Sequence, residues 1–341
     1  MISDDLMFYI KTTETCNLNC DHCFTSGKNG KKIYFDPKNV ANWVNGVKEC
    51  RPSAKAHFEF HGGEPFLAPV SDMWTFYNLT KDKWENPTYG ITTNLVHKLT
   101  EEKLEFMDKV LNKRIGTSWD PTIRFDNKQQ EDLFESNVKL LLDRGYTIKL
   151  FVSLTNDAVQ LGPKFIMEYV RSLGVQEMAL ERITHDGNAT ENAVFPSNLD
   201  LQIFFLTMHT FMKENDARDW FDNEFMENVY SKFETGNMGA GTFCRDCEQK
   251  LFTINADGSI AGCPNSAPTS AFGHIDDDPS IVINSPKRCE VIMSELQRDP
   301  RCYECKVYKY CKGDCHQLVW EENVCAAPKL LMQELDRELH G

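Results

Sequence analysis

The first 184 residues alternate between strand-like and helix-like segments, and this alternation constrains the fold more than any other feature. Six strands separated by helices predict a parallel α/β sheet with right-handed crossovers. Periodicity alone leaves open whether the sheet is flat or curls into a full or partial barrel. In either arrangement, active-site residues belong at the carboxyl ends of the strands. The predicted strands are Leu6–Thr13, His57–His61, Tyr89–Leu95, Arg114–Trp119, Thr147–Thr155 and Glu177–Ile183, and the predicted helices are Asn39–Glu49, Val70–Leu79, Glu101–Leu111, Gln129–Leu142 and Lys164–Leu173.

The alternation stops after Thr184, and the rest of the chain has a different character. Two helical patterns, Leu199–Met212 and Trp220–Phe233, predict a bridging segment. Beyond it the sequence is rich in turns and cysteines and carries one hairpin pattern, with the turn Asn255–Gly258 between strands 251–254 and 259–263. A helix over 328–339 closes the chain. We therefore expect three parts: a parallel α/β domain over residues 1–184, a helical bridge over 185–243 and a cysteine-rich domain over 244–341.

Composition narrows the class of protein. A net charge of −14, with no basic stripe beyond Lys28, Lys31 and Lys32, argues against an extended nucleic-acid-binding surface. The N-terminal residues lack the pattern of a signal peptide, and no stretch reaches the roughly 18 apolar residues of a membrane helix. We expect a cytoplasmic protein. Because thiols stay reduced in that compartment, its thirteen cysteines are better explained as metal ligands than as disulfides.

Three cysteines crowd the loop that follows the first predicted strand. Their spacing is Cys16-x3-Cys20-x2-Cys23, which lacks the second Cys or His pair of a zinc finger. His22 offers a fourth ligand for zinc, but it sits beside Cys23 on the same turn. Three thiolates on one loop suit a cubane iron–sulfur cluster better, with its fourth iron open to a small molecule.

This motif resembles the signature of the radical S-adenosylmethionine (SAM) enzymes, C-x3-C-x-Φ-C after the first strand of a partial (βα)6 barrel. The resemblance implies that SAM chelates the open iron and is cleaved by one electron to a 5′-deoxyadenosyl radical. That radical removes a hydrogen atom from a C–H bond of the substrate, so the cofactor carries the difficult chemistry. The usually aromatic Φ position, which contacts the adenine, is His22 in this chain.

A second motif follows the second predicted strand. Gly62, Gly63, Glu64 and Pro65 match the family's GGEP motif, which holds the SAM amino group. Two glycines allow close backbone approach, and a glutamate can accept hydrogen bonds from an ammonium. By the same resemblance, later strand ends contact the methionine carboxylate or the ribose, although ordinary strand-end turns explain each of them equally well. These further candidates are Thr93, Asn94, Ser118, Asp120, Arg124 and Ser153.

The C-terminal cysteines resemble a SPASM domain, an extension of some radical SAM enzymes that carries auxiliary [4Fe–4S] clusters. The resemblance implies two fully ligated clusters, and hence three in the whole protein. A zinc ribbon, the alternative for any two Cys-x2-Cys pairs, does not explain the whole pattern. Auxiliary cluster I would take Cys244, Cys247, Cys263 and Cys315, and auxiliary cluster II would take Cys302, Cys305, Cys311 and Cys325.

Two cysteines, Cys50 and Cys289, remain outside these sets. Free cysteines are most often small buried hydrophobes, which is the expectation for both. The alternative is that Cys289 donates a hydrogen atom to a product radical. Further weak catalytic candidates at the end of the sixth strand are Glu181, Arg182, His185 and Asp186, for which solvated loop charges are the simpler interpretation.

The resemblance implies an α/β fold, a partial TIM-like barrel followed by a small cysteine-rich α+β SPASM domain. We expect an enzyme that oxidises or rearranges a C–H bond of a peptide-like substrate. A sulfatase-maturing activity is less favoured, because Pro264 stands where that branch carries an aspartate. The alternatives are an isomerase or mutase of an amino acid, free or attached to a carrier or nucleobase, and a non-catalytic electron carrier. A flavodoxin- or ferredoxin-type reductant and a separate leader-peptide-binding protein are the expected partners.

Overall fold

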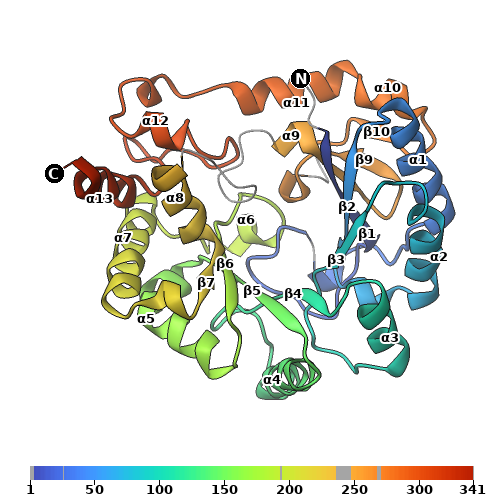
Figure 1. The fold of residues 1–341 in the computed structure, drawn as a ribbon, viewed down its shortest axis with the longest axis horizontal. Coiled ribbons are helices and arrows are strands. Elements are labelled where there is room, and N and C mark those ends of the chain that lie inside the picture. The colour runs from blue at the N-terminus through green and yellow to red at the C-terminus, as the bar shows by residue number, and fades with distance from the viewer. Residues whose placement is uncertain (1–3, 26, 193, 236–246, 267–269, 341) are drawn as a thin grey trace.

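A computed structural model describes residues 4–25, 27–192, 194–235, 247–266 and 270–340. Its strands form two sheets that together curve into a partial barrel (Figure 1), with the orders β10-β9-β8-β1-β2-β3 and β4-β5-β6-β7. A parallel bridge between Thr92 and Gly116 joins the two sheets between β3 and β4. All pairs from β1 to β6 are parallel, so the carboxyl ends of these strands meet at one rim, as the sequence predicted.

The strands and helices have the following bounds. The strands are β1 Asp5–Thr13, β2 Lys55–Gly62, β3 Thr88–Ile91, β4 Arg114–Ser118, β5 Thr147–Ser153, β6 Glu177–Glu181, β7 Asp222–Asn223, β8 Leu251–Ile254, β9 Ser259–Ala261 and β10 Gly273–His274. The α-helices are α1 Pro37–Cys50, α2 Val70–Thr80, α3 Glu101–Lys109, α4 Lys128–Asp143, α5 Asn156–Ser172, α6 Asn188–Asn192, α7 Asn198–Glu214, α8 Glu224–Thr235, α9 Cys247–Lys250, α10 Pro279–Ile283, α11 Pro286–Leu296, α12 Tyr308–Cys311 and α13 Lys329–His340.

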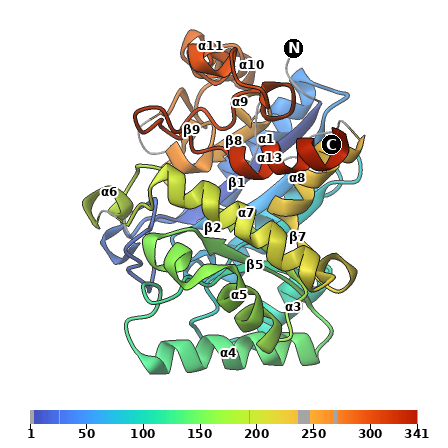
Figure 2. The same cartoon turned by 90° about the vertical axis from the view of Figure 1, so that its left-hand side faces the viewer.

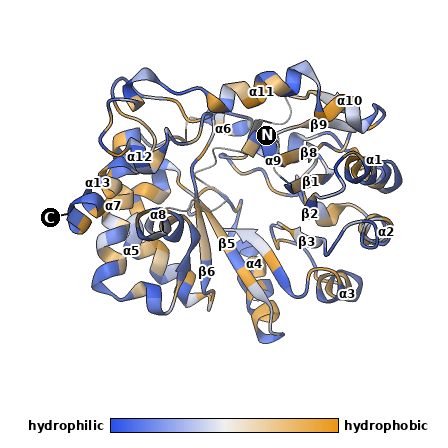
Figure 3. Cartoon of the chain, turned by 45° about the horizontal axis from the view of Figure 1, so that its top comes forward, coloured by the Kyte–Doolittle hydropathy of each residue, from blue (hydrophilic) through white to orange (hydrophobic). Residues whose placement is uncertain are grey.

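The helices begin where short polar side chains cap them. Asp36 accepts from the Lys38 and Asn39 N–H groups at the start of α1, and Thr100 accepts from the Lys103 N–H group at the start of α3. Such caps satisfy N–H groups that have no partner inside the helix. The helices carry hydrophobic and hydrophilic faces (Figure 3), and those around the barrel bury their apolar residues toward the strands.

The C-terminal hairpin is continuous with the barrel sheet. It forms as predicted, β8 pairing antiparallel with β9, but β8 also pairs parallel with β1. The Phe8 ring stacks between those of Phe58 on β2 and Phe252 on β8, at centroid distances of 5.3 and 5.4 Å. Packing of these buried rings thus holds the hairpin against the first strand. The cysteines that follow β8 are therefore held close to the barrel rim.

Three predicted elements differ most in extent. The helix predicted over 164–173 begins earlier, at Asn156, because its two halves meet at a kink where Gly162 has φ +80° before Pro163. The third strand ends at Ile91. The second bridge helix begins at Glu224, because Asp222–Asn223 extend the sheet beside β6.

The last helix, α13, closes the chain against α7 and lies beside α8 (Figures 1 and 2). Within the described ranges, no helix is long and apolar enough to span a bilayer.

Candidate active site and metal centres

The first cysteine trio lies on the loop after β1, at the rim of the barrel. Burial raises the pKa of Cys16 to about 11 and that of Cys20 to about 12, and the neighbouring Cys23 contributes to both shifts. Such mutual effects place the three thiols close together. Among the described residues no group of three His, Cys, Asp or Glu side chains is already at metal-ligand spacing. The donor set still fits iron, because buried thiols become thiolates only where a cation neutralises them.

The two glycines after β2 let the cysteine loop pack directly on the sheet. Gly63 N donates to Thr13 O at 3.0 Å, and Glu64 N donates to Thr15 O at 3.0 Å. A Cβ atom on Gly63 would lie 2.0 Å from Thr15 O, and one on Gly62, at φ +133°, would lie 2.3 Å from Thr13 O. Glycine is therefore required at both positions, and the segment leading into Cys16 is fixed by this turn.

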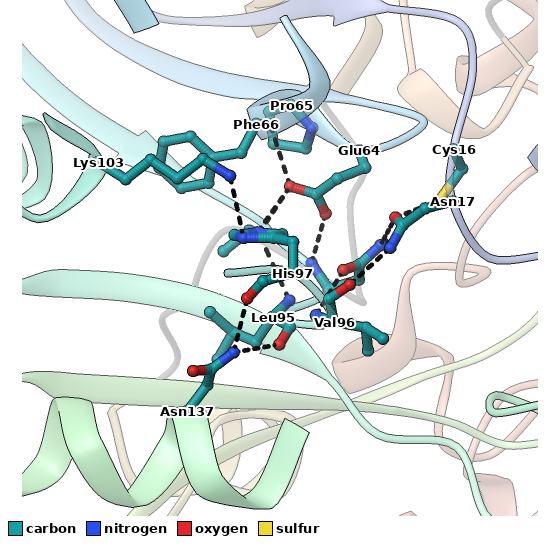
Figure 4. Close-up of polar contacts among 12 residues, drawn as sticks. Cys16, Asn17, Glu64, Pro65, Phe66, Leu95, Val96, His97, Lys103 and Asn137 are labelled. Carbon is teal, nitrogen blue, oxygen red and sulfur yellow. Dashed lines mark hydrogen bonds and ion pairs between the residues drawn. The ribbon is translucent and has the colours of Figure 1, made fainter. Parts of the chain in front are cut away.

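Glu64 organises the rim between β2 and β3 (Figure 4). Its side chain is fully buried and accepts hydrogen bonds from Phe66 N at 3.0 Å, Thr93 Oγ1 at 2.8 Å and Asn94 N at 2.7 Å. Burial alone would raise the pKa of Glu64, but His97 at 3.4 Å and these donors lower it below its ordinary value. The ionised carboxylate thus holds the Thr93–Asn94 turn, a contact that sequence reasoning did not foresee.

Asn94 connects the Glu64 carboxylate to the cysteine loop. Its Nδ2 atom lies 3.5 Å from Cys16 Sγ and donates to Asn17 Oδ1 at 2.7 Å. Asn17 in turn donates to Val96 O at 2.7 Å. The predicted residues Glu64, Thr93 and Asn94 are therefore brought together with the first cysteine.

Asp120 joins the other side of the rim to the same loop. Its buried carboxylate lies 3.1 Å from His22 Nε2 and accepts from Arg124 Nη1 and Ser153 N, each at 2.8 Å. Burial would raise the pKa of Asp120, but His22, Arg124 and the Ser153 N–H group lower it well below the usual range. The carboxylate thus gathers His22, Arg124 and Ser153 around one point. Ser118, the remaining candidate, ends β4 and pairs in register with Phe151.

Polar side chains also line the inner face of the barrel, and sequence reasoning missed most of them. Glu59 accepts from Thr92 Oγ1 at 2.8 Å and contacts His57 Nε2 at 3.1 Å, while Tyr9 meets the His61 ring edge-on at 5.8 Å. Lys149 pairs with Glu224 across β5 and α8. The alternation Tyr9-x-Lys11 and His57-x-Glu59-x-His61 was the available signal, because every second residue of a strand shares a face.

Glu181 occupies this inner face at the end of β6, in register with Ser153. Burial raises the pKa of Glu181 to about 7, and the nearby Glu224 carboxylate adds to the shift. No described side chain or N–H group forms a hydrogen bond or ion pair with its carboxylate. It is a titratable group directed toward the lumen, where the charges of Arg182 and Lys149 oppose the rise in its pKa.

The other catalytic candidates near β6 are Arg182, His185 and Asp186. The buried Arg182 guanidinium contacts the Asp314 carboxylate through both terminal nitrogens and donates to Ala326 O at 3.0 Å. His185 is exposed, and its ring stacks on Phe195 at 3.9 Å. Asp186 is partly buried in the turn that follows.

The C-terminal cysteines converge on one cavity. Its lining includes Cys302, Cys305, Cys311 and Cys325, the four residues assigned to auxiliary cluster II, together with Cys315. Burial raises the pKa of Cys325, with a contribution from Cys305. Burial likewise raises the pKa of Cys263, with a contribution from Cys315, a partner assigned to cluster I. These neighbours fit the interleaved assignment of ligands.

Two members of the predicted cluster I set, Cys244 and Cys247, differ from the other two. Cys244 lies outside the described residues. Cys247 is disulfide-bonded, so ligation by its sulfur requires that bond to be reduced.

Cys50 and Cys289 are both exposed, so the expectation that they fill the core is wrong. Cys50 is the last residue of α1, and Cys289 lies on the solvent side of α11, where its neighbour Arg288 takes the buried position. A thiol on this outer surface is badly placed to reach a radical held in the lumen.

Comparison with known proteins agrees with these features. Residues 10–152 match the radical SAM superfamily. Over 113 residues the chain is 31% identical to "Uncharacterized protein MJ0907" of Methanocaldococcus jannaschii, a match that spans 33% of this chain and 37% of that protein.

Solved structures extend the likeness to almost the whole chain. Native anSMEcpe with bound AdoMet superposes with a TM-score of 0.80 at 18% identity, covering 98% of this chain and 96% of the other. Streptococcus suis SuiB bound to the precursor peptide SuiA superposes with a TM-score of 0.64 at 15% identity, covering 98% and 76%. At these identities the likeness establishes the fold.

Proposed function

Since residues 10–152 match the radical SAM superfamily and the chain has the fold of SPASM-domain members of that superfamily, we propose that it is a radical SAM enzyme that oxidises or rearranges a C–H bond of a peptide-like substrate. A [4Fe–4S] cluster with SAM supplies a hydrogen-abstracting 5′-deoxyadenosyl radical when both are bound. The observation that carries the proposal is the packing of the segment 13–16, which leads into the cysteine loop, directly against the Gly62–Gly63 turn. An electron carrier needs no such SAM-binding turn beside its cluster.

The residues of this chain hold the cofactors in place. Cys16, Cys20 and Cys23 would bind the first cluster, and Asn94 orients Cys16 through its contact with the sulfur. Asp120 fixes the His22 ring, which would then stack on the adenine of SAM. The buried Arg124 lies beside Cys20, whose Sγ atom is 3.7 Å from Arg124 O, and offers a cation for the methionine carboxylate.

Two known structures support a peptide-like substrate. anSMEcpe was solved with the Cp18Cys peptide, and SuiB with its precursor peptide SuiA. A flavodoxin- or ferredoxin-type protein would supply the electron, and the two auxiliary clusters proposed for the C-terminal cysteines would accept one from the substrate. An isomerase acting on an amino acid is the alternative, and SAM consumed per turnover separates the two, because a returned hydrogen atom spares SAM.

We assign the role of proton acceptor to Glu181. Net oxidation of a carbon radical that bears a heteroatom releases a proton with the electron, and a carboxylate that accepts no hydrogen bond from the described residues can take it. The raised pKa of about 7 places this carboxyl near the operating pH of a general base.

A reconstitution experiment tests the proposed function. Anaerobically reconstituted protein should contain about twelve irons, four for each of three clusters, and should convert SAM to 5′-deoxyadenosine with dithionite. The variant Cys16→Ala/Cys20→Ala/Cys23→Ala should lose about a third of the iron and all SAM cleavage. Cys50→Ala, an exposed cysteine at the end of α1, is the matched control and should behave like wild type. Zinc at the first site, or SAM cleavage by the triple variant, would disprove the proposal.

Glu181→Gln tests the proton acceptor. In wild type the rate of product formation should rise with pH through about 7, because the carboxylate form is the active base. The variant should lose this rise and about 10²–10⁴-fold in product formation, the usual contribution of general base catalysis. Substrate-free formation of 5′-deoxyadenosine should not change. Glu168→Gln, on the outer face of α5, is the control, and an unaltered pH profile in Glu181→Gln would exclude this role.

A further inference from the structure

A short basic segment lies beside the first cysteine loop and has no part in the function proposed above. Residues 27–35, named here the lysine segment, contain Lys28, Lys31 and Lys32 but no aspartate or glutamate. All three lysines are exposed, in a chain whose net charge is −14. Exposed lysines are most often simply solvated, so the surroundings of the segment decide whether it has a purpose.

The backbone of the lysine segment is bonded to the loop that carries the proposed ligands of the first cluster. Gly27 O accepts a hydrogen bond from Cys16 N at 3.1 Å, and Ile33 O accepts one from Thr13 Oγ1 at 2.7 Å. Tyr34 also forms an antiparallel bridge with Thr13. The backbone that carries the lysines is therefore fixed beside Cys16, while the lysines themselves are exposed to solvent.

Most of the positive charge of this segment is free to attract a partner. Lys28 Nζ lies 2.5 Å from Asp126 Oδ2, but both side chains are exposed, and such pairs contribute little. Lys31 and Lys32 form no ion pair or side-chain hydrogen bond with the described residues. Burial raises the pKa of Asp257, but its hydrogen bonds with a neighbouring serine and the charge of Lys31 lower it. These two carboxylates therefore balance the three lysines only in part.

The position of the lysine segment favours an electron carrier as its partner. A donor that docks there lies against residues bonded directly to Cys16 N, next to the cluster that must receive an electron. An acidic carrier is repelled by a chain of net charge −14 and is attracted where exposed lysines gather, which speeds its association. Tyr34 is 50% exposed and adds an aromatic side chain, a type that is enriched at protein interfaces.

We propose that the lysine segment is the docking surface for the acidic face of a one-electron carrier of the flavodoxin or ferredoxin type. The carrier is oxidised by one electron, and the first cluster is reduced by the electron that SAM cleavage then consumes. This inference deepens the proposed function and rests on it, because only a cluster at this loop needs an electron delivered there.

The experiment compares two reductants on the reconstituted protein. Dithionite is a small molecule that needs no docking surface, whereas a reduced acidic flavodoxin must bind before it delivers its electron. The variant Lys28→Glu/Lys31→Glu/Lys32→Glu should lower the flavodoxin-driven rate of SAM cleavage by about 10-fold or more, the scale of electrostatic steering. Its dithionite-driven rate should stay at the wild-type level. Isothermal titration calorimetry with oxidised flavodoxin should show weaker binding to this variant than to wild type.

Two matched variants control for charge and for position. Arginine keeps the positive charge, so Lys28→Arg/Lys31→Arg/Lys32→Arg should behave like wild type with both reductants. The second control makes the same change in net charge at exposed sites on the outer helices α3, α4 and α5, and it should also leave both rates close to wild type. This variant is Lys109→Glu/Lys139→Glu/Lys164→Glu.

The outcomes separate this inference from the proposed function. Wild type that cleaves no SAM with dithionite would contradict the proposed function, and calorimetry would still test the docking surface. Equal losses with dithionite and flavodoxin in the glutamate variant would assign the lysines to the cysteine loop or to an acidic substrate, and would overturn the inference. Unchanged flavodoxin binding, or an equal loss in the outer-helix control, would overturn it as well. Loss of the flavodoxin-driven rate and of flavodoxin binding, confined to the glutamate variant of the lysine segment, supports it.

A second group of exposed lysines tests whether the docking surface is specific. Lys306, Lys309 and Lys312 lie among the C-terminal cysteines and are exposed as well. Lys306→Glu/Lys309→Glu/Lys312→Glu should leave flavodoxin binding and the flavodoxin-driven rate of SAM cleavage close to wild type. Loss of both in this variant, with no loss in the glutamate variant of the lysine segment, would place docking beside the C-terminal cysteines and overturn the inference.

Discussion

Gly63→Ala is expected to lower the rate of SAM cleavage about 100-fold in otherwise folded protein. The new methyl carbon would lie 2.0 Å from Thr15 O, 2.3 Å from Thr15 C and 2.8 Å from Cys16 N, all of which are backbone atoms. Because no flexible side chain can move aside, the segment leading into Cys16 must shift. A displacement of about 1 Å in a catalytic group costs on the order of 100-fold in rate. The rate of 5′-deoxyadenosine formation and the iron content measure the effect.

Gly145→Ala provides the matched control. Gly145 also has a positive φ of +79°, but a Cβ atom there would meet nothing within 4 Å. Alanine at this position carries only the backbone strain of about 1–2 kcal/mol, with no steric clash. It should lower the melting temperature slightly and leave cluster content and SAM cleavage unchanged. Equal loss of cleavage in both variants would show that general destabilisation, and not the close contact beside Cys16, is responsible.

The alternating pattern was sufficient to predict the strands and helices of a parallel α/β sheet, because local periodicity reports which face of each element is buried, whereas its closure into a partial barrel was expected only from the family resemblance. It could not show that Phe252 stacks on Phe8, since pairing between strands far apart in the chain leaves no local pattern. The hairpin was recognised, but its parallel pairing with β1 was not. The kinked helix was predicted only from Lys164 onward, because the pair Gly162 and Pro163 is typical of a helix break.

The sequence motifs located the cysteine loop and the residues around it. The roles of individual side chains could be assigned only from their contacts in the structure. Glu64 was expected to face SAM through its carboxylate, and the structure gives that carboxylate protein partners at both oxygens. Arg182 was placed at the rim by its position after β6, but the distant Asp314 determines what it does.

The contact of Arg182 with Asp314 joins the barrel to the cysteine-rich segment. The guanidinium and carboxylate are both buried, with Arg182 Nη2 at 2.9 Å from Asp314 Oδ1, and the Arg182 side chain also lies over the Phe225 ring at 5.5 Å. Asp314 stands between Cys311 and Cys315, and the Ala326 oxygen that also accepts from Arg182 follows Cys325. This single guanidinium therefore fixes two ligand-bearing segments to the end of β6.

Removing one partner of this pair should be among the most destabilising single changes in the protein. Asp314→Asn keeps the left-handed backbone at φ +59°, which asparagine tolerates, but removes the carboxylate charge that pairs with the buried Arg182 guanidinium. Breaking a buried pair in this way costs about 3–5 kcal/mol. Thermal unfolding of the reconstituted protein and the rate of iron release during heating should both show it, and Arg182→Met should have an effect of similar size.

The double variant Arg182→Met/Asp314→Asn distinguishes pairing from separate effects. Because it removes the buried cation, its loss of stability should be smaller than the sum of the two single losses, which is the mark of direct coupling. Arg218→Met is the comparison, since Arg218 pairs with Glu227 at a partly exposed site and its loss should cost about 1 kcal/mol or less. Additive losses in the double variant would mean that Arg182 and Asp314 stabilise the two segments independently. The link between β6 and the cysteine-rich segment would then lie in the surrounding packing, including the Arg182 contact with Phe225.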